Sequence, residues 1–355
     1  MTTLARYLVR NVLGYTALVL LVLLALGALF LFIGQQDDIG VGTYTVTDAL
    51  LFVALNLPTY LAQLMPVGAL IGALLALGNL ARGSELVVMR ASGVTTLQFC
   101  RWLGLAGLVL TALMVMLGEF VAPPLQKYAK QLKVFSKYSE FSFAGNRGAW
   151  IRDGNAIISV DQQSARTTYG GVQLFRFDPE RALLSVGRAA SASVDEDGSW
   201  RLDKYTETRF VAEGTDVSDA PLFDVSSSLS ADFLGLAALE PEAMSMRELL
   251  AYVGHLKQND LDAKHFEIAF WSRAARMLAG VLVVILALPF ALGPMRSAGQ
   301  GTRTVVGILI GAGFVLLAQT VENSGQLFDL PAWLVGWAPT ALLAVLTAAL
   351  LLRAR

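Results

Sequence analysis

Residue types that carry out chemistry are scarce in this chain of 355 residues. The sequence has no Gly-x-x-x-x-Gly-Lys-Ser/Thr loop to hold nucleotide phosphates, no His-Glu-x-x-His and no Gly-x-Ser-x-Gly. Its one cysteine, Cys100, excludes an internal disulfide and a cysteine-based zinc site. The histidines, His255 and His265, are ten positions apart around an expected helix end, which is poor spacing for metal ligands. We therefore expect a protein that is not an enzyme and binds no cofactor or metal of its own.

Residues 82–93 form a polar segment between two membrane-length apolar runs. Ser84 can cap a first helical turn by accepting a backbone N–H, Glu85 puts negative charge at the positive end of the helix dipole, and Gly93 supplies a left-handed stop. The helix between them is about 12 Å long, too short to cross a bilayer. It either docks into a groove on a soluble partner or only turns the chain at the membrane surface. The candidate docking residues are Ser84, Glu85, Leu86, Val87, Met89 and Arg90, and Leu86, Val88 and Met89 are expected to form the apolar side.

Four lysines follow the third apolar run at intervals of three, three and four residues. On a helix this spacing places them along one face just beyond the membrane. A basic stripe of this kind can bind lipid phosphate, and the alternative is a set of ordinary interfacial lysines. The residues are Lys127, Lys130, Lys133 and Lys137.

Ionisable residues also lie within the apolar runs, where charge is costly and usually faces an aqueous path or a partner. Arg273 and Arg276 lie one and two turns into the outer half of the fourth run. Glu119 and Glu322 lie near the outer ends of the third and fifth runs. The arginines either line a cavity that admits an anionic substrate, or snorkel to the surface while Arg273 pairs with Glu119.

Composition defines the class of protein. The chain is 55% hydrophobic and 15% charged, with a mean hydropathy of +0.57, which is typical of an integral membrane protein. Residues 125–264 hold 16 of the 27 basic and 20 of the 28 acidic residues, so a soluble domain lies between two membrane blocks. Its acidic balance gives no indication of nucleic-acid binding.

Six apolar runs are long enough to cross about 30 Å of hydrocarbon. They are residues 12–33, 49–80, 97–121, 266–292, 304–321 and 332–352. Pro58 and Pro66 predict a tilted or kinked second span, and Pro123 and Pro124 are expected to close the third.

The basic residues near the spans set the orientation. With six spans, one side carries Arg6, Arg10, Arg82, Arg90, Arg101, Arg296, Arg303, Arg353 and Arg355, and the other carries Asp37, Asp38 and Asp329. The positive-inside rule therefore predicts that both termini and the 82–93 helix are cytoplasmic, and that the large domain lies on the opposite side of the membrane.

The soluble domain is predicted to be all-β. Residues 149–152 and 156–160 flank Asp153-Gly154-Asn155, a hairpin signal, and further strands are expected at 172–177, 189–194 and 200–210. Short strands at this spacing predict a sandwich or jelly roll, followed by a helix at 244–258. The predicted architecture is an integral membrane α-helical protein with three spans in residues 1–124, a β domain of sandwich or jelly-roll type in 125–262 and three spans in 263–355.

Two pairs of glycines have the spacing that lets membrane helices approach closely. They are Gly68 with Gly72 and Gly307 with Gly311, and they give a weak indication of packing against a partner helix.

Three stretches carry a family resemblance: Ser84-Glu85-Leu86-Val87-Val88-Met89-Arg90-Ala91-Ser92-Gly93, Gly118-Glu119-Phe120-Val121-Ala122-Pro123 and Phe290-Ala291-Leu292-Gly293-Pro294-Met295-Arg296-Ser297. With the order of three spans, β domain and three spans, nearly the whole chain resembles the lipopolysaccharide-export permeases LptF and LptG. The third stretch is more similar to the G-type subunit.

The resemblance implies a set of partners and a location. It implies a second permease of the LptF type, a cytoplasmic ATPase dimer of the LptB type that binds ATP and Mg, a single-span LptC-type protein, a periplasmic LptA-type bridge and lipopolysaccharide. The 82–93 helix would be the coupling helix that lies in the ATPase groove. The location would be the inner membrane of a Gram-negative bacterium, with the β domain as a periplasmic jelly roll that feeds a bridge of similar domains.

One departure from the family concerns the lipid phosphates. Relatives can carry lysines at the outer end of the first span, where this chain has Leu31, Asp37 and Asp38. Lys130 and Lys133 match basic positions of the family and become the better candidates. Two alternatives remain open: a permease for another lipid or lipoprotein, and a non-transporting membrane anchor for the β domain.

Overall fold

The computed structural model describes residues 3–137, 141–142, 149–165, 168–178, 180, 182–194, 199–211, 214–226, 241–292, 300–327 and 330–353. The chain divides into two compact units. The helical unit comprises Met1–Asp37, Ala49–Ala129 and Lys264–Arg355, and the β unit comprises Asp38–Asp48 and Lys130–Ala263.

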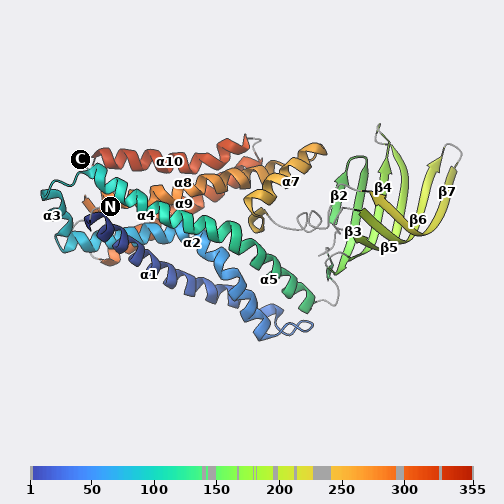
Figure 1. Cartoon of the computed structure of the whole chain (residues 1–355), viewed down its shortest axis with the longest axis horizontal. Helices are drawn as coiled ribbons and strands as arrows, with labels where there is room; N and C mark the ends of the chain where they lie inside the picture. The colour runs from blue at the N-terminus through green and yellow to red at the C-terminus, as the bar shows by residue number, and fades with distance from the viewer. Residues whose placement is uncertain are drawn as a thin grey trace. The chain divides into compact units, whose positions relative to one another are not determined.

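Long apolar helices make up the helical unit. The helices outside the β-strand region are α1 (Thr3–Ile33), α2 (Val46–Arg82), α3 (Glu85–Ala91), α4 (Thr96–Met116), α5 (Ala122–Lys137), α8 (Lys264–Leu292), α9 (Gln300–Leu327) and α10 (Ala332–Arg353) (Figure 1). Six segments of the described chain are long and apolar enough to cross a membrane, namely Thr3–Asp38, Val46–Arg82, Thr96–Lys133, Lys264–Leu292, Val305–Gly325 and Ala332–Arg353. The prediction of six spans is confirmed.

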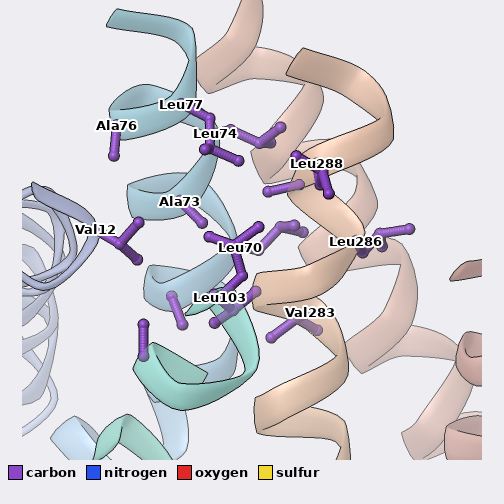
Figure 2. Close-up of a cluster of buried hydrophobic side chains, with 14 of the residues drawn as sticks. Val12, Leu70, Ala73, Leu74, Ala76, Leu77, Leu103, Val283, Leu286 and Leu288 are labelled. Atoms are coloured by element: carbon purple, nitrogen blue, oxygen red, sulfur yellow. The ribbon is translucent and has the colours of Figure 1, made fainter. Parts of the chain in front are cut away.

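Helix α2 is the centre of the helical unit. In the most apolar 18-residue stretch of α2, 72% of the residues are buried, whereas the corresponding share is 11% in α1 and 11% in α9. Leu70, Leu74 and Leu77 of α2 point toward Val283 and Leu288 of α8 in one cluster of buried side chains (Figure 2). Helices α1 and α9 therefore present most of their apolar surface outward, to lipid or to another chain.

The two glycine pairs pack helices of this chain against one another. A side chain at Gly72 would overlap the backbone of Thr16 in α1, and one at Gly68 would overlap Leu20. A Cβ at Gly311 would lie 3.0 Å from Val67 of α2, and one at Gly307 would lie within 3.1 Å of Leu74 and Ile71. The close approaches expected from the spacing are present, but they are intramolecular, so the spacing no longer indicates a second chain.

The third span does not end where the prolines predicted. The segment Leu117–Val121 is a π-helical turn, and α5 begins directly after it with Pro123 and Pro124 in its first turn. A proline lacks the N–H of the helical ladder and its ring clashes with the carbonyl four residues back, a conflict that a wider turn relieves. The prediction that Pro123 and Pro124 close this helix is wrong, since it continues to Lys137.

The β unit contains one antiparallel sheet. Its strands are β1 (Phe141–Ser142), β2 (Ala149–Asp153), β3 (Ala156–Ala165), β4 (Thr168–Phe177), β5 (Leu183–Val194), β6 (Ser199–Val211) and β7 (Gly214–Ser226). Strands β3 to β7 follow one another as a meander (Figure 1). Strands β1 and β2 both pair with β3. Asp153 pairs with Ala156 across Gly154-Asn155, as the hairpin signal predicted. The prediction of a β domain is confirmed. The predicted sandwich or jelly-roll topology is wrong for the described strands, because consecutive strands pair with one another in a single sheet that bends back on itself.

Helix α7 (Met246–Gln258) follows the sheet, as predicted for this region. The Ser245 hydroxyl accepts a hydrogen bond from the backbone N–H of Glu248, while the Glu248 carboxylate accepts one from the backbone N–H of Ser245. This capping box fixes where the helix begins.

The sheet curls and encloses its own core. Tyr169 and Trp200 are 1% exposed and stack with their ring centroids 5.8 Å apart. The guanidinium of Arg176 in β4 lies 5.3 Å from the ring centroid of Phe223 in β7, although two strands separate these strands in the sheet. Such a contact across the concave face requires a strongly bent sheet.

Irregular residues shift the inward-facing positions partway along the strands. In β4 the buried side chains Tyr169 and Val172 are three apart, with Gly171 at φ +63 between them. In β6 Leu202 and Tyr205 are also three apart, with Lys204 at φ 52 between them. The strand pairing keeps its register across both positions, so no extra residue is inserted there. The register shifts lie elsewhere, between Gln163 and Ala165 in β3 and between Arg176 and Phe177 in β4, where a bulge or irregularity bends the sheet locally.

Candidate functional site

Helix α3 (Glu85–Ala91) is the short helix that the sequence predicted between the second and third spans. The predicted cap is wrong, because the Ser84 side chain makes no capping hydrogen bond. Ser84 has a left-handed backbone, φ 59 and ψ 4, whereas a capping side chain needs an extended backbone to reach the first-turn N–H groups. The main-chain carbonyl of Ser84 instead accepts from the N–H of Val88 at 3.0 Å.

The Glu85 carboxylate is held at the beginning of α3 by another helix. The Tyr7 hydroxyl of α1 donates a hydrogen bond to Glu85 Oε2 at 2.8 Å. At the other end of α3, Gly93 has φ +93, and the N–H of Val94 donates to the Met89 carbonyl at 3.1 Å. The predicted left-handed stop at Gly93 is confirmed.

The two faces of α3 have different surroundings. Leu86 and Met89 are 3% and 5% exposed and belong to the main core cluster, so they anchor the helix. Val88, which was expected on this apolar side, is 65% exposed, because positions 86 and 89 share a face that position 88 does not. Val87 and Arg90 are exposed too, so α3 is a fixed helix with an outward-facing valine and charged surface.

A groove of about 360 Å³ lies beside α3. It is formed by the end of α2, by α3 and by the end of α8, and its lining residues are Ala81, Leu86, Val87, Arg90, Ala91, Ala291 and Leu292. An apolar hollow next to an exposed helix face is a surface that another protein can contact.

Arginines gather at the end of the helical unit that carries α3. Both chain termini lie at this end (Figure 1). Arg6, Arg10, Arg82, Arg90, Arg101 and Arg353 are all exposed. Residues 293–299, with Arg296 and part of the Phe290–Ser297 stretch, lie outside the described residues, as do Asp329, Arg355 and the side chain of Arg303.

Both arginines within the fourth span face carboxylates. Arg273 lies 3.4 Å from Glu119, and Arg276 lies 3.7 Å from Glu322. The pair of Arg273 with Glu119, one of the two alternatives from the sequence, is present. Glu119 belongs to the π-helical turn, a feature that often marks functional positions and that the sequence did not predict. The Arg276 side chain is 43% exposed against 20% for Arg273, so Arg276 is the more accessible cation.

The lysines of α5 are half-buried where the structure describes them, at Lys127, Lys130 and Lys133. Lys133 Nζ lies 2.6 Å from Asp38 Oδ2. The loop after Asp38 is also tied to α5, because the N–H of Thr43 donates to the Ser136 carbonyl at 2.7 Å. Asp38, which stands where a base was expected, therefore holds one lysine of the stripe. The side chain of Lys137 lies outside the described residues.

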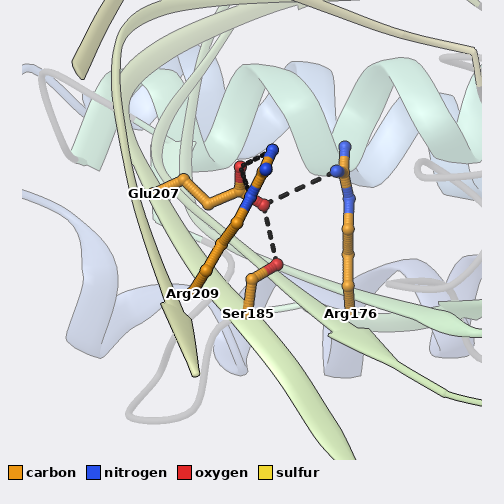
Figure 3. Close-up of polar contacts among 4 residues, drawn as sticks. All are labelled: Arg176, Ser185, Glu207 and Arg209. Atoms are coloured by element: carbon orange, nitrogen blue, oxygen red, sulfur yellow. Dashed lines mark hydrogen bonds and ion pairs between the residues drawn. The ribbon is translucent and has the colours of Figure 1, made fainter. Parts of the chain in front are cut away.

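A buried ionic cluster in the β unit was not predicted. Glu207 is 2% exposed, and its carboxylate accepts hydrogen bonds from Ser185 at 2.7 Å and from Arg209 at 3.0 and 3.2 Å (Figure 3). Arg176 lies 3.5 Å from the same carboxylate. Burial acts to raise the pKa of Glu207, but these hydrogen bonds and positive charges outweigh it and hold the pKa below its usual value.

The described residues define a multi-pass membrane protein with the permease arrangement, in which a short exposed helix follows the second span and a β unit is inserted between the third and fourth. Residues 6–353 match the family described as lipopolysaccharide export system permease LptF/LptG, so the chain belongs to that family. It is 30% identical to the LptG permease protein of Escherichia coli strain K12 over 98% of this chain and 97% of that protein. It is 28% identical to LptG of Haemophilus influenzae over 99% of both chains. The resemblance inferred from the sequence, including its G-type character, is confirmed.

Proposed function

We propose that this chain is the G-type permease subunit of an ATP-driven exporter that extracts lipopolysaccharide from the outer leaflet of the inner membrane of a Gram-negative bacterium. Membership of the LptF/LptG family supports the substrate, since the similar proteins are named for lipopolysaccharide export. The observation that carries the proposal is α3, whose Leu86 and Met89 are locked into the helical core while Val87, Val88 and Arg90 face outward. An anchored helix with a free outer face suits a groove on a soluble partner.

The energy source must be a partner subunit. Moving each CH₂ out of a bilayer costs about 0.8 kcal/mol. Lifting a lipid with several acyl chains therefore costs roughly tens of kcal/mol before apolar protein surface replaces the lost contacts with the bilayer. The sequence has no loop for nucleotide phosphates. We therefore propose an LptB-type ATPase dimer that binds ATP and Mg and docks on α3, an LptF-type second permease, an LptC-type single-span protein and an LptA-type periplasmic bridge.

The proposed orientation places the α3 end of the helical unit in the cytoplasm and the β unit in the periplasm. The exposed arginines at that end support it through the positive-inside rule. For lipid phosphates we propose the lysines Lys127, Lys130, Lys133 and Lys137, with Arg273 and Arg276 lining the lipid path. Arg276 is the stronger of the two arginines in this role because more of its side chain is exposed.

The docking role of α3 is tested by Val88→Asp in the complex of both permeases with the ATPase. A buried, unpaired charge at the interface is expected to reduce co-purification of the ATPase at least about tenfold, since every 1.4 kcal/mol is a factor of ten. Val88→Thr, which keeps the shape, is the matched control. Full ATPase recruitment by Val88→Asp would overturn the docking role.

The substrate is tested in proteoliposomes that contain either lipopolysaccharide or only phospholipids. The wild-type complex is expected to transfer lipopolysaccharide to an acceptor bridge protein in an ATP-dependent way, measured by photo-crosslinking. Stimulation of ATP hydrolysis by a different lipid, with no transfer of lipopolysaccharide, would show that the substrate is wrong.

A further inference from the structure

One hydrogen bond joins the first membrane helix to the helix proposed to contact the ATPase. Tyr7 in α1 and Glu85 in α3 are 78 positions apart, and their side chains meet at 2.8 Å. Nothing in the local sequence of either helix requires this contact. A hydrogen bond from a neutral donor to a charged acceptor is among the stronger polar contacts in proteins.

The carboxylate of Glu85 is held on more than one side. Its Oε1 would lie 3.4 Å from a Cβ at position 83, so it lies against Gly83. The Ser84 hydroxyl makes no capping bond that would otherwise fix the first turn of α3. The Tyr7 hydroxyl is therefore the side-chain donor that the structure provides for orienting this carboxylate among the described residues.

Packing adds to the polar contact. Leu8 and Val12, the next inward positions of α1, are 0% exposed and belong to the same buried cluster as Leu86 and Met89 of α3. The first turns of α1 and the inner face of α3 therefore belong to one large buried cluster, to which α2, α4 and α8 also contribute, and the Tyr7 hydroxyl adds a direct polar link between α1 and α3 at its exposed edge.

The middle of α1 has a second fixed point. At Thr16 the helix lies directly against Gly72 of α2, with no room for a side chain between the backbones. Beyond this point α1 is mostly exposed, with Leu21 at 69% and Phe30 at 70%. Tyr7 lies about 14 Å from Thr16 along the helix axis, and Ile33 about 25 Å beyond it, at 1.5 Å per residue. One turn further, Leu20 lies against Gly68 of α2, so Thr16 and Leu20 together form the point about which α1 can tilt. A displacement of the Tyr7 end would therefore move the longer, exposed part of α1 on the other side of these contacts.

We infer that Tyr7 is a positioning residue for Glu85 and ties α1 to α3, so that α1 moves when the partner ATPase moves α3. This inference rests on the proposed docking role of α3. Helix α3 is covalently flanked by α2 and α4, and the Tyr7 contact adds α1 as a third helix that receives its movement.

The test compares Tyr7→Phe with the wild type in the full complex. The ring is retained and only an exposed hydroxyl is lost, so assembly and ATP hydrolysis are expected to stay within about twofold of wild type. Lipopolysaccharide transferred per ATP hydrolysed is expected to fall at least about threefold. Tyr15→Phe, two turns along the same helix, removes the same atom and is the matched control.

A spectroscopic measurement separates transmission from simple stability. Spin labels at Leu26 in α1 and Val345 in α10, both exposed, report the distance between these helices with and without trapped nucleotide, in a Cys100→Ser background. The wild type and Tyr15→Phe are expected to show a nucleotide-dependent change in distance that Tyr7→Phe loses. An unchanged distance response in Tyr7→Phe would overturn the inference, as would failure of this variant to assemble. Absence of any response or transfer in the wild type would instead count against the proposed function.

Discussion

The buried carboxylate of Glu207 shows how the β unit accommodates charge inside a curled sheet. Its two arginines are partly in solvent, with 34% of the Arg176 side chain and 57% of the Arg209 side chain exposed, whereas only 3% of the Glu207 side chain is exposed. The acid is thus the member that loses its hydration, and Ser185 and both guanidinium groups replace the lost water. Removal of the acid leaves the two guanidinium groups next to each other, at the edge of the buried core, with no negative charge between them.

Glu207→Gln is therefore expected to lower the free energy of unfolding of the β unit by about 2 kcal/mol. This value is typical of hydrogen bonds to charged groups, and it is not larger because both arginines are partly exposed to solvent. Hydrogen–deuterium exchange of the full-length protein measures the effect as faster exchange in peptides from β5 and β6. Asp260→Asn, which removes an exposed carboxylate just after α7, is the control and should leave these rates unchanged. Equal protection in both variants would contradict the assigned role.

The same carboxylate predicts a pH dependence. Its pKa is lowered on folding from the ordinary value of 4.5. The folded state therefore holds fewer protons than the unfolded state as pH falls below that value, and the stabilisation is complete above it and lost on acidification. The thermal midpoint of the sheet, followed by circular dichroism, should drop more steeply below about pH 4.5 in the wild type than in Glu207→Gln. Parallel pH profiles would show that another group controls acid stability.

At the scale of elements, glycines are as important as apolar side chains for packing the helices of the helical unit. Gly72 lets α1 contact α2, a Cβ at Gly107 of α4 would lie 2.9 Å from Val281 of α8, and one at Gly336 of α10 would lie 2.6 Å from Trp271. Membrane helices gain little from burying apolar surface away from lipid, so close backbone packing carries more of their association.

Gly72→Ala is expected to lower the thermal midpoint of the detergent-solubilised protein by several degrees, because the added methyl overlaps Thr16 and overpacking costs about 1–3 kcal/mol. Gly14→Ala is the matched control, since nothing lies within 4 Å of its Cβ, and it should be neutral or stabilising by about 0.5–1 kcal/mol. If Gly72→Ala and Gly14→Ala change the thermal midpoint equally, the effect at Gly72 comes from helix propensity and not from close packing against α1.

The spans and the first hairpin could be predicted because their signals are local. Twenty or so apolar residues require a helix in lipid, and Asp153-Gly154-Asn155 between alternating residues favours a tight turn. The Ser84 conformation was missed because a serine before an acid is an ordinary cap, and only the tight reversal after α2 makes it left-handed. The π-helical turn at Leu117–Val121 was missed because prolines usually end helices.

At the scale of the whole chain, the unpredicted contacts are those between residues far apart in sequence. Tyr7 with Glu85 and Lys133 with Asp38 both join segments that no periodicity connects. These contacts change the interpretation of the predicted candidates, since Glu85 is held by α1 and Lys133 is partly neutralised by an acid. Residue type and spacing identified the candidates, and only the fold supplies their partners.

The lysine stripe gives a prediction for transport. Charge reversal at Lys130 and Lys133 together is expected to reduce photo-crosslinking of lipopolysaccharide to this subunit about tenfold while the complex still assembles, because two cations that would meet lipid phosphate become acids. Loss of the Lys133–Asp38 pair is a competing cause, so the control adds Asp38→Lys to the same reversal of Lys130 and Lys133 and thereby exchanges the charges of the pair. That exchange restores an ion pair of opposite polarity, in which the base no longer belongs to α5. If the exchange restores crosslinking, the pair serves only to hold the loop against α5, and lipid phosphate does not require the base at position 133. If crosslinking stays low, the position of the base on α5 is what the lipid requires.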